Sequence, residues 1–346
     1  MLRRVILIRR NSELELGYNI FHSVTEIMLD RAKVPGWTKA SVVEISGNNR
    51  RDKKIIEREL KGGNIDLIHF TNQDDAALVP KNNLVPVAIS VHNLFDFRPR
   101  TLDAGDIPIP LGNRNPSSKY LRFMEDCKMG FNRSDLVICS TKMTQGMASE
   151  LFPNTTNSMV RIPVDTDFWN YKNNFIDRDF NENFGISDKL LLVSVGDSSK
   201  MFRQNFIDSV IESLPSNIKD DIFLMKIGIQ KLTKVQILGA YNNAEAMLFP
   251  GITIGLQNPT LEAMAVGCKV IASSLPTHDE ILPKASLLEP SDIECWKDEI
   301  IKLHDDWSKS GKVTMFRDEE LISTSKKYNF DAQGIKLAHA YNSIIR

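Results

Sequence analysis

A polar loop that runs into the start of a helix is the part of this sequence best suited to chemistry. The apolar run Met247–Phe249 predicts a short strand, and the polar segment Gly255–Pro259 follows it. After Thr260 come residues that favour a helix, and Glu262 stands in the first predicted turn. Unpaired backbone N–H groups at the start of a helix point toward a ligand and favour negative charge. This stretch therefore predicts a phosphate-binding site.

Strands that alternate with helices are expected to position this loop. The predicted strands are Val5–Ile8, Ser41–Ile45, Ile65–Phe70, Val85–Val91, Leu136–Ser140, Leu190–Val195, Ile222–Ile227, Met247–Phe249 and Lys269–Ala272. The predicted helices are Ile20–Met28, Arg50–Leu60, Lys119–Phe131, Thr144–Leu151, Phe206–Leu214, Val235–Asn243, one from Leu261 that ends at Gly267, and Asp331–Ile345. Asn93–Ser118 predicts a long loop of the kind that often forms a lid or binding loop. The alternation indicates an α/β fold with parallel sheets and helices on their faces.

The length of 346 residues favours two domains. The polar segments Pro153–Asn157 and Asp165–Glu182 lack periodicity and indicate the break between them. We therefore expect a doubly wound, Rossmann-like domain over residues 1–165 and a second one over residues 166–330. The amphipathic helix at residues 331–346 is expected to pack back on the first domain.

Residues directly after the predicted strands are the candidates for a ligand site. In doubly wound domains, ligands bind outside the carboxyl ends of the strands, and two such domains place the ligand in the cleft between them. The candidates are Gly17, His92, Asn93, Ser140, Thr141, Lys142, Gly196–Arg203, Gly228 and Ile252–Glu262.

The composition is that of a globular protein without an overall charge preference. Lys and Arg number 43 and Asp and Glu number 44, so the chain as a whole is not expected to attract nucleic acid. The four cysteines show no CxxC spacing, which argues against a zinc cluster or a redox pair. The apolar run in MLRRVILIRRNS is too short for a signal peptide or a membrane span, so we expect a cytoplasmic protein.

Two charged groups leave alternatives open. Asp74 and Asp75 would suit a metal ion, but adjacent acidic residues also open a helix, which is the interpretation we favour. A basic cluster beside the long loop would suit a peripheral membrane contact on the cytoplasmic face, although such clusters are more often simply solvated. Its residues are Arg98, Arg100, Arg114, Lys119 and Arg122.

Five segments together resemble the retaining glycosyltransferases of the GT-B fold, in particular the group 1, family 4-like enzymes. The segments are Val91–Asn93, Ser134–Ser140, Val160–Phe168, Val195–Gly196 and Tyr241–Glu280. Their order and spacing carry the resemblance, which is strongest from Asp135 to Glu280. It implies two Rossmann-like domains that face each other across a cleft, and no cofactor or metal beyond the substrate. The implied reaction moves a hexose from a nucleoside-diphosphate sugar to a glycan or lipid-linked sugar, with retained configuration.

The resemblance also implies roles at the nucleotide. Glu262 matches a glutamate that bonds the ribose hydroxyls, and a carboxylate accepts two vicinal hydroxyls at once. The alternative is an acidic first-turn residue favoured by the helix dipole alone. The other implied nucleotide-binding residues are Gly17, Gly196, Gly228, Gln257, Asn258, Pro259 and Thr260.

Three residues match positions near the reacting groups. Lys200 and Arg203 are assigned to the leaving diphosphate, whose charge needs cations, with a solvated basic loop as the alternative. His92 matches a histidine that contacts the sugar, with a structural histidine as the alternative. His69 and His278 are expected to be structural.

The sequence departs from the family pattern at two positions. Ile254 stands eight residues before Glu262, where relatives carry a second glutamate, and Asp197 occupies the usual arginine position. Gln257 or Thr253 is then the remaining polar contact for the sugar. These departures keep open a nucleotide-sugar-binding scaffold without transferase activity, and more weakly an epimerase or hydrolase.

Overall fold

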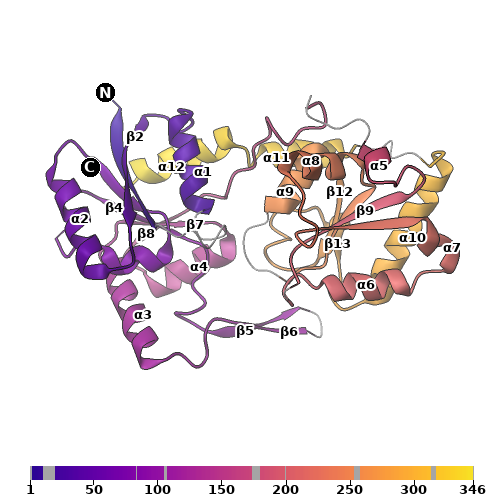
Figure 1. Ribbon diagram of the computed structural model, residues 1–346. Coiled ribbons are helices and arrows are strands. Elements are labelled where there is room, and N and C mark those ends of the chain that lie inside the picture. Colours follow the sequence, from indigo (N-terminus) through magenta and orange to yellow (C-terminus); the bar gives the residue numbers. More distant parts are fainter. Residues whose placement is uncertain are drawn as a thin grey trace. The chain divides into compact units, whose positions relative to one another are not determined.

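The computed structural model describes residues 2–10, 20–82, 84–104, 107–173, 180–198, 200–252, 258–312 and 317–345 (Figure 1). The chain forms two compact units. Unit 1 comprises Met1–Arg100, Pro110–Pro163 and Phe330–Arg346, and unit 2 comprises Thr101–Ile109 and Val164–Asn329. Each unit is an α/β domain with its own parallel sheet.

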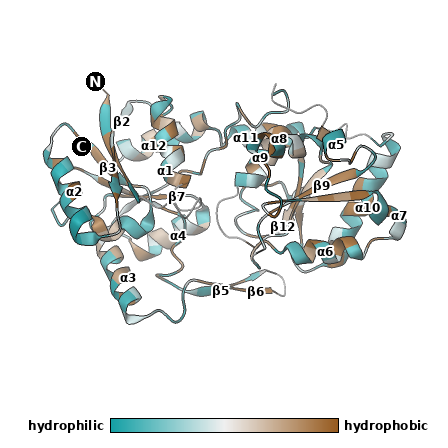
Figure 2. Ribbon diagram, viewed as in Figure 1, coloured by the Kyte–Doolittle hydropathy of each residue, from teal (hydrophilic) through white to brown (hydrophobic). Residues whose placement is uncertain are grey.

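Unit 1 is built on a six-stranded parallel sheet in the order β2-β1-β3-β4-β7-β8. The strands are β1 Arg3–Arg10, β2 Trp37–Ile45, β3 Leu67–Phe70, β4 Val87–Val91, β7 Leu136–Cys139 and β8 Thr156–Met159. The helices are α1 Ile20–Asp30, α2 Asn49–Lys61, the 3-10 helix η1 Gln73–Leu78, α3 Ser118–Phe131, α4 Lys142–Leu151 and α12 Phe330–Asn342. The middle of β1, Val5–Ile8, and the whole of β7 are apolar and buried because helices cover both faces of the sheet, which is why the sequence predicted them. Figure 2 shows these apolar strands.

Two predictions for connecting segments were wrong. The segment Pro153–Asn157 contributes to β8, whose polar residues pair with β7 alone and are partly solvated at the edge of the sheet. The predicted long loop contains a two-stranded sheet of β5 Arg100–Ala104 and β6 Ile107–Leu111. Within the described residues, strand β6 has a partner strand, β5, on one side only. Pro108 and Pro110 stand two residues apart, so their nitrogens face the same side of β6, and a missing N–H is tolerated on the side without a partner.

Helix α12 completes unit 1 from the far end of the sequence. The Tyr341 hydroxyl lies 2.7 Å from His69 Nδ1 in the buried sheet, and Lys33 Nζ forms an ion pair with Asp331 at 2.7 Å. Gly334 lies directly against the backbone of Lys33, where an added Cβ would come within 2.1 Å of the Lys33 carbonyl oxygen. This close approach requires glycine, although its φ is not in the left-handed region.

Unit 2 is built on a five-stranded parallel sheet in the order β10-β9-β11-β12-β13. The strands are β9 Leu190–Val195, β10 Ile222–Ile227, β11 Ala246–Phe249, β12 Lys269–Ser273 and β13 Leu287–Leu288. The helices are α5 Phe180–Asn183, α6 Gln204–Glu212, α7 Ser216–Asp221, α8 Lys234–Asn243, α9 Asn258–Val266, the 3-10 helix η2 Lys284–Ser286, α10 Ile293–Lys309 and α11 Glu319–Lys326. The sequence analysis predicted none of α5, α7, β13, α10 and α11.

Side chains from alternate strand positions of unit 2 enter two apolar layers. Val193 and Met247 pair in register and pack with residues of α8 and α9. Their neighbours Leu192 and Leu248 face the opposite way, toward α6 and α10, where Trp296 is fully buried. Both faces of the sheet are therefore covered, and the polar groups that could bind a ligand are left at the strand ends.

The described part of the chain contains no helix that is long and apolar enough to cross a membrane. The three buried cysteines and the exposed Cys295 are all free thiols.

Candidate functional site

The carboxyl edge of the unit 2 sheet has the topology of a ligand site. Strand β9 lies between β10 and β11, and the chain reaches β10 through α6 and then returns past β9 to β11 through α8. The connections that follow the neighbouring strands β9 and β11 therefore run in opposite directions, toward β10 and toward β12. In doubly wound sheets this switch point forms a crevice at the carboxyl ends of the strands, where ligands bind.

Two glycines make a close backbone contact at this edge. Gly196 follows β9 with φ +140° and Gly228 follows β10 with φ +101°. A Cβ on Gly228 would lie 2.8 Å from the Gly196 oxygen, and a Cβ on Gly196 would lie 2.2 Å from the Phe202 ring. Both positions therefore require glycine on two grounds, backbone conformation and space. The contact leaves bare backbone at the end of β9, which a phosphate can approach closely.

Arg203 is fixed at the same edge. It precedes α6 in the left-handed conformation, with φ +50°. Its Nη1 donates to the Pro290 oxygen at 2.6 Å and to the Pro250 oxygen at 3.4 Å, and its guanidinium stacks on Phe206 at 4.1 Å. Carbonyl groups orient the guanidinium without neutralising it, and burial lowers its pKa from the usual value. The side chain therefore holds a positive charge at the strand ends.

Lys200 is not brought into this arrangement. Its side chain is exposed, as is that of Asp197 at the usual arginine position. Unlike Arg203, Lys200 has no hydrogen bond or ion pair with another described residue that would orient its charge.

Helix α9 starts three residues earlier than predicted. It begins at Asn258, so Asn258, Pro259 and Thr260 form its first turn, and Thr260 is buried. Proline is well tolerated in this turn because no backbone N–H is needed there. The helix ends as predicted at Gly267, with φ +81°, where Cys268 N donates to Ala263 O and Gly267 N donates to Met264 O, both at 3.0 Å. Ile254 and Gln257 lie outside the described residues.

Glu262 stands half-buried in α9, in an environment that favours its neutral form. Burial raises the pKa of its carboxyl to about 8, and Lys234 at the start of α8 acts against that shift. Lys234 Nζ lies 3.9 Å from the centre of the Phe168 ring, so this cation is held beside Glu262 by aromatic packing. A ligand that donates hydrogen bonds to the carboxylate would favour ionisation.

His92 follows β4 in unit 1 and has a fixed backbone with an unpaired ring. Gln73 Oε1 accepts the N–H groups of His92 at 2.9 Å and Asn93 at 3.1 Å, while Thr144 Oγ1 donates to the His92 oxygen at 3.2 Å. The ring packs on Phe21 at 4.9 Å, and neither ring nitrogen has a hydrogen-bond partner among the described residues. Burial lowers the pKa of His92 to about 4, so the imidazole is neutral at pH 7.

Other candidates have structural partners. His69 is bound at both nitrogens, by Tyr341 and by Ser90 Oγ, each at 2.7 Å, and His278 Nδ1 donates to the Ser273 oxygen at 2.5 Å. Asp75 lies buried in η1 and pairs with Arg10 at 2.7 Å, in agreement with the helix-opening interpretation. The described residues contain no cluster of acidic, histidine or cysteine side chains that could hold a metal ion.

Two further candidates from the sequence are Thr141, which follows β7, and Gly17. Thr141 caps α4 by accepting the Thr144 N–H at 3.1 Å, which is a structural role. Gly17 lies outside the described residues.

Two residues that act on candidate residues, one in each unit, were not predicted from the sequence. Gln73 fixes the backbone of His92 and Asn93, and Lys234 lies beside Glu262. Gln73 was not a candidate because candidates were taken directly after predicted strands, and Gln73 lies in η1. Lys234 follows Thr233, whose capping box with Gln236 marks the start of α8 in the sequence.

Comparison with known proteins bears on this geometry. Residues 189–306, which span β9 to α10 and include the glycine pair, Arg203 and Glu262, match the family described as glycosyl transferases group 1. The resemblance to these enzymes is confirmed over this segment. A comparison with curated proteins gave no match.

Solved structures of low identity share the whole architecture. Sucrose-phosphate synthase from Thermosynechococcus elongatus is 12% identical with a TM-score of 0.70, and the match covers 99% of this chain and 98% of that one. HepE of Anabaena in complex with UDP is 10% identical with a TM-score of 0.69, over 99% and 100%. A UDP-forming trehalose-phosphate synthase from Burkholderia xenovorans is 11% identical with a TM-score of 0.66, over the full length of both chains. The fold is therefore GT-B, with two Rossmann-like domains, as the sequence predicted.

Proposed function

We propose that this protein is a glycosyltransferase that moves a hexose from a nucleoside-diphosphate sugar to a hydroxyl of a glycan or lipid-linked sugar, with retained configuration. The observation that carries the proposal is the carboxyl edge of unit 2. There the matched segment combines the Gly196–Gly228 contact, the oriented charge of Arg203 and the start of α9 with Glu262. The complexes of HepE with UDP and UDP-glucose make a uridine diphosphate sugar the first donor to test.

The chemistry proposed for this edge is mostly electrostatic. Departure of a nucleoside diphosphate leaves negative charge, which Arg203 and the N–H groups of the first turn of α9 would stabilise. Because Arg203 is already oriented by Pro250 and Pro290, little reorganisation is needed when the charge develops. Glu262 would accept hydrogen bonds from the ribose hydroxyls.

His92 is assigned to the sugar. Its ring is neutral at pH 7 and lacks hydrogen-bond partners among the described residues, so one nitrogen can accept a bond from a sugar hydroxyl while the other donates. The backbone bonds from Gln73 and Thr144 hold the ring in place for this role.

The test is incubation with UDP-, GDP- and ADP-sugars labelled in the sugar, with and without a pool of glycan and lipid-linked acceptors. Free nucleotide, free sugar and transferred sugar are measured separately, and the anomeric configuration of the product is read by NMR. We expect acceptor-dependent transfer with retention, unchanged by a metal chelator. Sugar release without acceptor would instead indicate a hydrolase.

A second candidate is a nucleotide-sugar-binding scaffold without turnover. Ile254 and Asp197 favour it, because an apolar residue and an acidic one replace groups that relatives use at the sugar and the diphosphate. Donor binding by calorimetry with no transfer from any donor would support this candidate and overturn the transferase.

A further inference from the structure

Helix α2 of unit 1 presents a cationic face that has no partner in the described chain. Its sequence places five basic side chains, Arg50, Arg51, Lys54, Arg58 and Lys61, within about 100° of its circumference, and all five are exposed. The opposite face carries Asp52, Ile56 and Leu60, which are buried against the unit. The helix is therefore amphipathic, and cations predominate on its outer face. Figure 2 shows α2 as a mainly hydrophilic helix.

Helix α2 also carries three acidic residues, Asp52, Glu57 and Glu59, of which only Glu57 is exposed, at the edge of the cationic face. Asp52 points inward and accepts hydrogen bonds from Ser46 N at 3.1 Å and Ser46 Oγ at 2.9 Å. Within the described chain, none of the five cations forms an ion pair. In a protein of net charge −1, so many uncompensated cations on one helix indicate an anionic partner.

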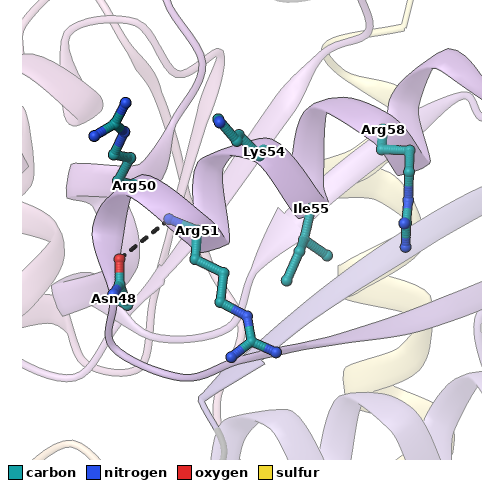
Figure 3. Close-up of a pocket in the computed structure, with 6 residues that line it drawn as sticks. All are labelled: Asn48, Arg50, Arg51, Lys54, Ile55 and Arg58. Atoms are coloured by element: carbon teal, nitrogen blue, oxygen red, sulfur yellow. Dashed lines mark hydrogen bonds between the residues drawn. The ribbon is translucent and has the colours of Figure 1, made fainter.

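The first hollow on this helix is lined by cations around one apolar side chain. It has a volume of about 510 Å³, and Figure 3 shows Arg51, Ile55 and Arg58 extending to the same side of the helix. Asn48 Oδ1 accepts the Arg51 N–H at 3.2 Å and fixes the start of the helix. The positive charges are therefore carried on a rigid element.

A second hollow on the other flank of α2 adds apolar groups to the same surface. It has a volume of about 620 Å³, and Lys53 and Lys61 of α2 line it together with Leu84 and Met129. Leu84 is 68% exposed and Met129 is 44% exposed, which is unusual for large apolar side chains. Lys81 and Arg133 also line this hollow, so its four cations outnumber its two carboxylates, Glu57 and Asp126.

We propose that this surface, made of α2, Lys81, Leu84 and Met129, docks on an anionic lipid bilayer. Anionic headgroups match the cations, and the interfacial region of a bilayer takes up exposed apolar side chains. Nucleic acid fits less well, because no aromatic side chain lines either hollow to stack on a base, and phosphates give Leu84 and Met129 nothing to bury against.

The cluster beside the long loop is a weaker candidate for this role. Arg98 forms an ion pair with Glu150, and Arg100 stacks on Phe95 at 5.5 Å. These two side chains already have partners, whereas those of α2 do not. The lipid contact is therefore assigned to a different surface from the one that the sequence suggested.

The experiment is co-sedimentation of the full chain with vesicles of phosphatidylcholine alone or mixed with phosphatidylglycerol. We expect binding to the anionic vesicles that weakens with salt. The variant Arg50→Gln/Lys54→Gln/Arg58→Gln should lower the partition coefficient on the order of 100-fold, since each basic residue contributes several-fold. The matched control Lys231→Gln/Lys302→Gln/Lys309→Gln removes three exposed cations from unit 2 and should bind like the wild type.

A second variant tests the apolar part. Leu84→Ser should lower the binding that persists at high salt several-fold, whereas Ile335→Ser, at another exposed apolar position (48% exposed), should not. Thermal unfolding checks that each variant is folded. Equal binding to both vesicle types, an α2 variant that binds like the wild type, or α2-dependent binding to an oligonucleotide but not to vesicles would each overturn the proposal. No donor sugar is present, so the result is independent of the proposed transferase activity.

Discussion

Glu262 and His92 share a physical state, in which burial favours the neutral side chain. For Glu262 the pKa is raised to about 8, and for His92 it is lowered to about 4. Desolvation is the leading cause in both. Of the two, only Glu262 has a pKa close enough to 7 for ligand binding to change its protonation near neutral pH.

Nucleotide affinity is expected to depend on pH through Glu262. The free carboxyl has a pKa of about 8, and hydrogen bonds from the ribose would lower it in the complex, so binding releases a proton below pH 8. Affinity for UDP should therefore fall several-fold from pH 8.5 to pH 7, a range above the phosphate pKa of about 6. Calorimetry on the wild type and on Glu262→Gln checks this. An unchanged slope in the variant would remove Glu262 from the site.

His69 is expected to make unit 1 sensitive to acid. Burial lowers its folded pKa to about 3, so its neutral form contributes stability that is complete above pH 6.5 and is lost as the pH falls toward 3. At pH 5 the loss relative to pH 7.5 amounts to about 2 kcal/mol. Hydrogen exchange of the β3 amides at both pH values measures it. In His69→Asn, itself destabilised, this increment should disappear, and its persistence would assign the acid sensitivity to another group.

At the scale of elements, the turn after β9 depends on the contact between Gly196, Gly228 and Phe202. Gly196→Ala must adopt a φ of +140° and displace the Phe202 ring, so we expect a loss of about 2–4 kcal/mol in the stability of unit 2. Gly146→Ala in α4 is the matched control, because it meets no atom within 4 Å and should stabilise by about 0.5–1 kcal/mol. Urea unfolding of both variants gives the comparison. Equal effects would mean that the turn rearranges freely.

At the scale of the whole molecule, unit 1 is assembled from distant parts of the chain. Tyr341 closes the hydrogen-bond path to His69 and Ser90, and Gly334 packs on Lys33. A chain ending at residue 163 should therefore lack cooperative unfolding, and fusion of residues 330–346 through a flexible linker should restore it. Near-ultraviolet circular dichroism during thermal unfolding distinguishes the two. Cooperative folding of the shorter chain would show that α12 is dispensable.

The sequence by itself determined the α/β class and the central strands, because β1, β7 and β9 are covered on both faces and must be continuously apolar. It also determined the end of α9 at Gly267, where the left-handed backbone favours glycine. Helix α10 was recoverable too, since Trp296, Ile300, Leu303 and Trp307 recur at helical spacing. The edge strand β8 was not, because an edge strand carries no apolar pattern.

Only the tertiary structure decided what each charged group at the site does. Arg203 is oriented by carbonyl groups of Pro250 and Pro290, and Lys234 reaches Glu262 from another helix. Which basic residues remain unpaired was likewise decided by folding, since Arg98 found Glu150 while the cations of α2 found no partner in the described chain. Sequence patterns reflect burial along one element, whereas pairing depends on residues that folding brings together from distant positions.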